Sequence, residues 1–270
     1  MQVLSKQRAL DHLRARIESI EKRPPLGDFA LPAAQNGLFA VPQGLLHEVF
    51  ADAGRDAGSA LGFTLGLVRT LMRPERQAVL MLKLKSDTQD LGAAYPVGLA
   101  SFGVDPEQVV FGRMESPTDL LWAIEEAIGC RAVTAVIADT GHEAKALDFT
   151  ASRRLSLRAA ASGSSVFLVR TGLEREATAA RLRWRVTPQP SQSPPFDARA
   201  PGPSRWRVEL QKGRLGSRRD PKEWLVDWTE NGFAIVTPEG GARARPAASQ
   251  RPPLSGAHPA ALGDRLSEAS

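Results

Sequence analysis

Short apolar runs alternate with helical stretches through the first two thirds of the chain, and this alternation constrains the fold most. The runs are Leu45–Phe50, Ala78–Leu84, Val109–Phe111, Ala132–Ala138 and Ser165–Val169. Helices are expected between them, around residues 60–73, 117–129 and 148–161. A strand that is apolar at nearly every position is buried on both faces, as in a parallel sheet covered by helices. The sequence therefore predicts an α/β fold built on a mostly parallel sheet.

The pattern changes in the C-terminal part of the chain. Residues 187–204 carry six prolines and are not expected to form a regular element. Apolar positions then alternate in two short segments, which predicts two strands with one buried face each. These positions are Trp206, Val208 and Leu210 in the first segment and Trp224, Val226 and Trp228 in the second. With the basic segment between them, they predict a β-hairpin that has a charged tip and its tryptophans in the core.

Four parts of the chain are expected. Residues 1–23 predict an N-terminal helix with one apolar stripe, formed by Leu10, Leu13, Ile17 and Ile20. A linker rich in proline and glycine covers residues 24–43, and the core domain spans residues 44–238. Residues 239–270 are rich in Ala, Pro, Gly and Ser without periodicity, which is typical of a disordered tail.

The composition excludes several classes of protein. No segment approaches the roughly 20 apolar residues that a membrane-spanning helix needs. The single cysteine, Cys130, rules out a disulfide framework within the chain, and the four histidines are far apart, so no metal site is expected. The charged N-terminus does not resemble a secretory signal. We therefore expect a cytoplasmic protein without a metal or cofactor.

A glycine-rich stretch follows the first predicted strand, where a nucleotide-binding protein would hold phosphate. The signature of such a loop is G-x-x-x-x-G-K-[ST], in which the lysine neutralises phosphate and the hydroxyl binds Mg²⁺. The best match is residues 57–64, where Gly62 and Thr64 fit, Ala57 replaces the first glycine and Phe63 replaces the lysine. We therefore interpret Ala57, Gly58, Gly62, Phe63 and Thr64 as a degenerate phosphate loop and assign no catalytic residue.

An aspartate ends the fourth predicted strand, VTAVIAD, at Asp139. In nucleotide-hydrolysing proteins an acidic residue in this position organises magnesium, as in a Walker B strand. A strand that simply ends in a polar residue is common and is the favoured reading of this pattern. Asp139 is thus a Walker B-like position whose role depends on whether phosphate binds nearby.

Several segments, in unbroken order from about residue 38 to 236, resemble the RecA ATPase core. They are GLLHEVF with the glycine turn and GFTLGL, then residues 102–128, AVIAD and WRVELQKGRLG. The degraded phosphate loop makes the chain more similar to the ImuA family. That resemblance implies a RecA-like core and a non-catalytic accessory role in SOS-type, damage-induced mutagenesis. It also implies an ImuB-type polymerase relative and an error-prone DnaE-type polymerase as partners.

Two surfaces are candidates for partner binding. The stripe of the N-terminal helix predicts docking onto RecA or a polymerase subunit, although packing within the chain or a homodimer would use the same stripe. Alternating residues near position 183 predict an edge strand with a basic outer face. We expect single-stranded DNA or an acidic protein to contact this face and the hairpin tip through Arg181, Arg183, Arg185, Arg214, Arg218 and Arg219.

Two alternative functions remain open at this point. One is a weakly active RecA-like ATPase in which Arg55 or another cation replaces the lysine. The other is a cell-division inhibitor similar to SulA, although such an inhibitor has no evident need for the basic C-terminal half. Nucleotide binding by the purified protein distinguishes the ATPase from an accessory protein.

Overall fold

The computed structural model describes most of the predicted core. The residues described are 39, 41–85, 94–141, 148–194, 196–197, 199–215 and 222–236. The predicted N-terminal helix and the predicted tail lie outside these residues.

The described residues form a nine-stranded sheet with the order β3-β2-β4-β5-β1-β6-β7-β8-β9. Neighbouring strands in the first part of this order, β3-β2-β4-β5-β1-β6, pair in parallel. Neighbouring strands in the remaining part, β6-β7-β8-β9, pair antiparallel. The strands are β1 (Leu46–Ala51), β2 (Ala78–Leu84), β3 (Val109–Met114), β4 (Val133–Gly141), β5 (Ser165–Thr171), β6 (Leu182–Gln189), β7 (Arg205–Lys212), β8 (Glu223–Thr229) and β9 (Gly232–Ile235). This arrangement confirms the α/β fold and the mostly parallel sheet, and it is consistent with a RecA-like core.

Four α-helices accompany the sheet in the described part of the chain: α2 (Ala57–Leu71), α4 (Pro96–Ser101), α5 (Pro117–Gly129) and α6 (Phe149–Ser162). Two of them begin at clear capping residues. The Ser116 hydroxyl accepts a hydrogen bond from the Asp119 amide, and the Asp148 carboxylate accepts one from the Ala151 amide. Helix α6 ends at Gly163, which adopts a left-handed conformation that glycine tolerates best.

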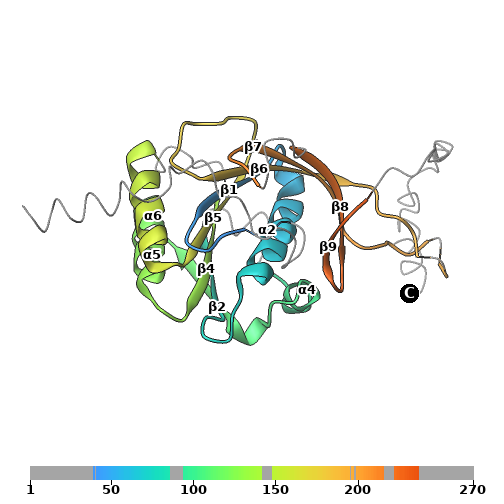
Figure 1. The fold of residues 1–270 in the computed structure, drawn as a ribbon, viewed down its shortest axis with the longest axis horizontal. Coiled ribbons are helices and arrows are strands. Elements are labelled where there is room, and N and C mark those ends of the chain that lie inside the picture. Colours follow the sequence, from blue (N-terminus) through green and yellow to red (C-terminus); the bar gives the residue numbers. More distant parts are fainter. Residues whose placement is uncertain are drawn as a thin grey trace, which may run out of the picture. The chain divides into compact units, whose positions relative to one another are not determined.

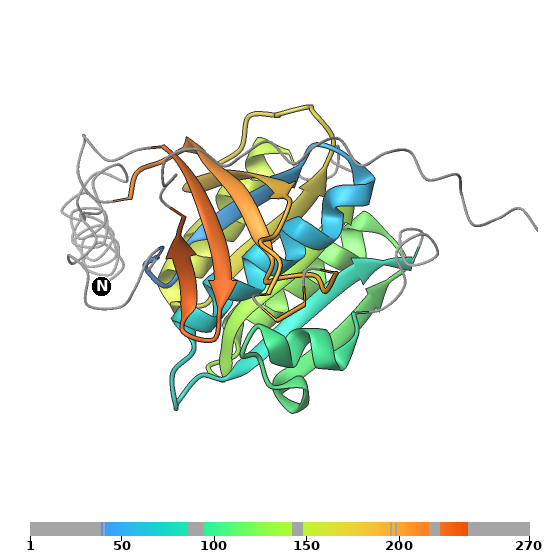
Figure 2. The same ribbon diagram turned by 90° about the vertical axis from the view of Figure 1, so that its right-hand side faces the viewer.

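The sheet curls around helix α2. Figure 1 shows α5 and α6 on one side of the parallel strands and α2 and α4 on the other. Figure 2 shows the C-terminal strands, in orange, passing across the outer side of α2, so that this helix lies inside the curl. One hydrophobic core therefore forms beneath α5 and α6, and a larger one surrounds α2.

The predicted hairpin is confirmed by β7 and β8, and its tryptophans pack into the core around α2. One prediction about the C-terminal part was wrong. Pro188 lies in β6, whereas residues 187–204 were expected to contain no regular element. Strand β1 pairs with β6 only as far as Arg185, so Pro188 occupies a stretch with one free edge and costs no hydrogen bond on that side.

Candidate functional site

The turn between β1 and α2 lies at residues 52–56, before the segment that the sequence suggested. Helix α2 already begins at Ala57, so the five expected loop residues, Ala57, Gly58, Gly62, Phe63 and Thr64, all lie within the helix. Beyond the first turn of a helix, the backbone N–H groups bond to carbonyls of the preceding turn and are not available to phosphate. The expected frame is therefore not a loop, and the sequence prediction is corrected on this point.

The side chains of Phe63 and Thr64 face the protein interior. Phe63 is fully buried, and its ring centroid lies 5.4 Å from that of Trp184 and 5.3 Å from that of Phe233. The Thr64 hydroxyl is also buried and donates to the Ala60 carbonyl oxygen at 2.8 Å. Phe63 thus belongs to the aromatic core, and Thr64 bonds to its own helix.

Two glycines of α2 allow aromatic side chains to approach the helix closely. A Cβ atom at Gly62 would lie 2.9 Å from the Phe102 ring, and one at Gly66 would lie 2.8 Å from the Trp228 ring. Real Cβ atoms essentially never come this close to another heavy atom. Gly62 and Gly66 therefore serve helix packing against the curled sheet, whereas Gly54 and Gly58 have open space around them.

The turn itself carries mixed charge. Arg55 is highly exposed, with its side chain 87% accessible, and it forms a long ion pair of 3.9 Å with Asp56. The carboxylate of Asp52 accepts hydrogen bonds from Arg185 Nε and Arg175 Nη2, both at 2.9 Å. The bond from Arg185 is the main reason that the pKa of Asp52 is lowered. This turn thus holds two carboxylates, one of which already binds two guanidinium groups.

Asp139 lies at the C-terminal end of β4, close to a cation on the neighbouring strand. Lys83 Nζ is 3.4 Å from Asp139 Oδ2. Among the described residues, no group of three or more His, Cys, Asp or Glu side chains is placed to hold a metal ion. Asp139 therefore takes part in an ion pair between β2 and β4. Both residues of this pair line a neighbouring pocket.

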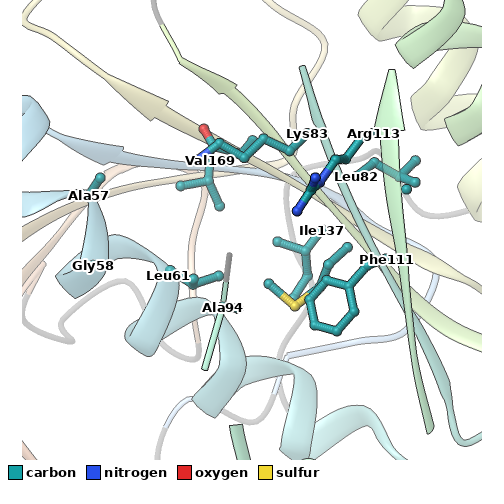
Figure 3. A pocket seen from close by; sticks show the side chains of 13 residues that line it. Ala57, Gly58, Leu61, Leu82, Lys83, Ala94, Phe111, Arg113, Ile137 and Val169 are labelled. Atoms are coloured by element: carbon teal, nitrogen blue, oxygen red, sulfur yellow. The ribbon is translucent and has the colours of Figure 1, made fainter. Parts of the chain in front are cut away.

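A pocket of about 380 Å³ lies between the start of α2 and the ends of β2, β3 and β4 (Figure 3). Such clefts at the carboxyl ends of parallel strands are the usual ligand sites of α/β proteins. Its lining is largely apolar and includes Leu61, Met81, Phe111, Ile137 and Val169. In Figure 3, the Lys83 and Arg113 side chains lie along the same part of the lining.

A buried ion cluster, which the sequence reasoning missed, lies on the other face of the sheet. It consists of Glu48, Arg170, Thr178 and Arg183. Glu48 accepts hydrogen bonds from Arg170 at 3.0 Å, Arg183 at 2.8 Å and Thr178 at 2.9 Å. An acidic residue inside the apolar run LLHEVF and an arginine at the end of SVFLVR were the only signals of this cluster in the sequence.

The predicted basic face is less available than expected. The expectation of an edge strand at residues 181–186 was wrong, because β6 lies between β1 and β7. Arg183 binds Glu48, and Arg185 binds Asp52 and Glu209. Arg181 is partly buried, which lowers its pKa. Arg214 is exposed. Arg218 and Arg219 lie outside the described residues, as do Leu10, Leu13, Ile17 and Ile20.

In the part of the chain that the structure describes, no helix has the length and apolar character needed to cross a membrane. No family model matches the chain. The chain is 31% identical over 204 residues to Protein ImuA of Caulobacter vibrioides, in strains NA1000 / CB15N and ATCC 19089 / CIP 103742 / CB 15. The match covers 71% of this chain and 78% of the Caulobacter proteins. With this identity and coverage, the chain belongs to the ImuA family.

Proposed function

We propose that this chain is a non-catalytic accessory protein of damage-inducible, error-prone translesion DNA synthesis. Membership of the ImuA family supports an accessory role in damage-induced mutagenesis. The observation that carries the non-catalytic part is the pairing of Asp139 with Lys83 at 3.4 Å. A lysine this close competes with Mg²⁺ for the carboxylate that a Walker B-type mechanism requires.

The strand-to-helix turn supports the same proposal. Phosphate loops combine converging backbone N–H groups with a lysine at the start of the helix. Here Asp52 and Asp56 flank the exposed Arg55, and α2 begins with Ala57 and Gly58. The turn offers a triphosphate no lysine, because its one basic residue, Arg55, is exposed to solvent and pairs with Asp56.

We further propose that the chain binds protein partners through surfaces outside this site. The resemblance to ImuA proteins favours an ImuB-type polymerase relative and an error-prone DnaE-type polymerase, with RecA as a third candidate. The stripe Leu10, Leu13, Ile17 and Ile20 is the proposed docking element, on the strength of its sequence pattern. Contact with single-stranded DNA would depend on Arg214, Arg218 and Arg219, because Arg183 and Arg185 are bound within the fold.

Nucleotide titration tests the non-catalytic assignment. We expect calorimetric titration of the purified chain with ATP and Mg²⁺ to show no saturable binding. Lys83→Ala removes the partner of Asp139 and is the matched variant, and we expect it to bind no ATP either, because buried Phe63 still stands where the motif lysine would be. Micromolar binding that disappears on Asp139→Ala would contradict the proposal.

A mutagenesis assay in the natural host tests the cellular role. We expect cells that lack this protein to accumulate fewer mutations after DNA damage. Expression of either the wild type or Asp139→Ala should restore the mutation frequency. If the wild type restores mutagenesis but a stably expressed Asp139→Ala does not, the carboxylate has a chemical role and the non-catalytic assignment is wrong.

Co-purification tests the docking element separately. Leu13→Asp combined with Ile17→Asp should abolish association with the polymerase-type partners or RecA. His12→Asp combined with Ser19→Asp introduces the same charges on the opposite side of the predicted helix and should leave association intact. Equal binding by both double variants would refute the role of the stripe.

A further inference from the structure

The loop between β6 and β7 presents an aromatic side chain to solvent. Phe196 is 98% exposed, the highest value among the large hydrophobic residues that the structure describes. Its ring therefore contributes nothing to the core of its own chain. Large exposed aromatic residues on loops are typical anchors of protein interfaces, because they bury much apolar area at a small entropic cost.

Hydrogen bonds join several of the described residues of this loop. At its base, the Gly202 amide donates to the Ser191 hydroxyl at 3.1 Å. Near its tip, the Asp197 amide donates to the Pro194 carbonyl at 3.3 Å, and the Ala200 amide donates to the Asp197 carbonyl at 3.2 Å. Contacts of this kind reduce the conformational entropy that a segment loses when it docks.

The residue after the aromatic anchor is acidic. Asp197 is exposed, and its Oδ1 atom accepts a hydrogen bond from the Arg199 amide at 2.8 Å. The tip thus displays an apolar ring next to a negative charge. A complementary surface needs an apolar cavity with a cation at its rim.

The pocket beside α2 has both properties. A cavity of about 150 Å³ is enough for benzene, so a pocket of about 380 Å³ accommodates a phenylalanine ring. Its lining is apolar around Leu61, Phe111 and Ile137. Arg113 also lines the pocket, is exposed, and forms no ion pair with another described residue.

We propose that this pocket receives Phe196 from a second copy of the chain, with the Asp197 carboxylate beside Arg113. The loop and the pocket are different surfaces, so the contact is head-to-tail and each copy offers one donor and one acceptor. Such an interface is small, and we expect a dissociation constant on the order of 10 to 100 μM. The inference does not depend on the proposed accessory function.

Analytical ultracentrifugation of the full chain over a range of concentrations tests the proposal. The average mass of the wild type should rise with concentration. Phe196→Ala removes the anchor, and Gly58→Leu fills the pocket from a position where a Cβ atom has no neighbour within 4 Å. Both variants should remain monomeric. The controls Leu173→Ala, another exposed apolar residue, and Gly129→Leu, another helical glycine with open space, should behave like the wild type.

Mixing the two defective variants gives the decisive result. Phe196→Ala keeps its pocket and Gly58→Leu keeps its loop, so the mixture should form one-to-one pairs and nothing larger. Arg113→Glu should weaken wild-type association at least tenfold, and adding Asp197→Arg to the same chain should restore it. A wild type that stays monomeric, association that survives Phe196→Ala, or a mixture that forms no pairs would each overturn the proposal.

Discussion

Arg170 and Glu48 meet between β5 and β1, with Nη1 of the arginine 3.0 Å from Oε1 of the glutamate, and both side chains are almost fully buried. The register explains the contact, because Phe50 lies opposite Arg170 and Glu48 is two residues earlier on the same face of β1. Arg183 from β6 binds the second oxygen of the carboxylate. The carboxylate thus ties together the three strands at the centre of the sheet.

Removing one partner of this buried ion pair should destabilise the fold strongly. Arg170→Met keeps much of the side-chain length but leaves Glu48 with less compensation in a dry environment, and we expect a loss of about 3 to 5 kcal/mol. Arg207→Met is the matched control, because the Arg207–Glu223 pair is solvent-exposed and should be worth less than about 1 kcal/mol. Chemical denaturation measures both free energies of unfolding. Similar losses in the two variants would show that burial does not govern the effect.

The close approach of aromatic rings to α2 predicts opposite effects for two glycines. Gly66→Ala places a methyl group against the rings of Phe233 and Trp228, and overpacking of this kind costs about 1 to 3 kcal/mol. Gly58→Ala meets no atom within 4 Å and should stabilise the helix by up to about 1 kcal/mol through helix propensity. Thermal and chemical unfolding of the two variants should therefore shift in opposite directions. If Gly66→Ala is as stable as Gly58→Ala, the rings move aside without cost.

His47 predicts a loss of stability in mild acid. Burial lowers the pKa of His47 to about 3, and its Nδ1 atom accepts a hydrogen bond from Trp184 Nε1 at 3.5 Å. Above the ordinary pKa of about 6.5, the side chain is neutral in both folded and unfolded states. As the pH falls below that value only the unfolded state takes up the proton, so the free energy of unfolding falls by about 1.4 kcal/mol per pH unit.

The measurement compares the wild type with His47→Gln, which cannot titrate and still offers Trp184 an acceptor. Free energies of unfolding between pH 6.5 and pH 4 should diverge in slope by about 1.4 kcal/mol per pH unit, with the wild type steeper. Contributions from carboxylates are common to both proteins and cancel in the difference. Parallel curves would mean that His47 takes up a proton in the folded state.

The parallel strands could be predicted from the sequence because their apolar character is a local property of each segment. β1 and β5 are buried at nearly every position, and their runs could be recognised without knowing their neighbours. The same local reasoning placed Trp206, Trp224 and Trp228 in the core, because alternation along a strand identifies its buried face. The sheet order and the curl around α2 depend on long-range pairing, which such patterns do not encode.

Two predictions about the site were wrong for specific physical reasons. The motif frame was chosen because Gly62 and Thr64 match the signature, and it fell inside the helix, whose N-cap is Asp56. Arg183 and Arg185 have the alternation of an exposed strand face, but Glu48 in β1 and Asp52, directly after β1, neutralise them. The identity of these partners became visible only when β1 and β6 were seen to pair.

Phe63→Lys separates the motif interpretation from the structural one. If residues 57–64 formed a phosphate loop, this change would restore its missing lysine and with it ATP affinity. In the structure the change instead buries a charge among Phe39, Trp184 and Phe233, so we expect a loss of more than about 3 kcal/mol and no ATP binding. Phe63→Leu is the control for loss of the ring alone and should be clearly more stable than Phe63→Lys. Unfolding curves and ATP titration measure both properties. A lysine variant that is as stable as the wild type and binds ATP would place position 63 at the phosphate site.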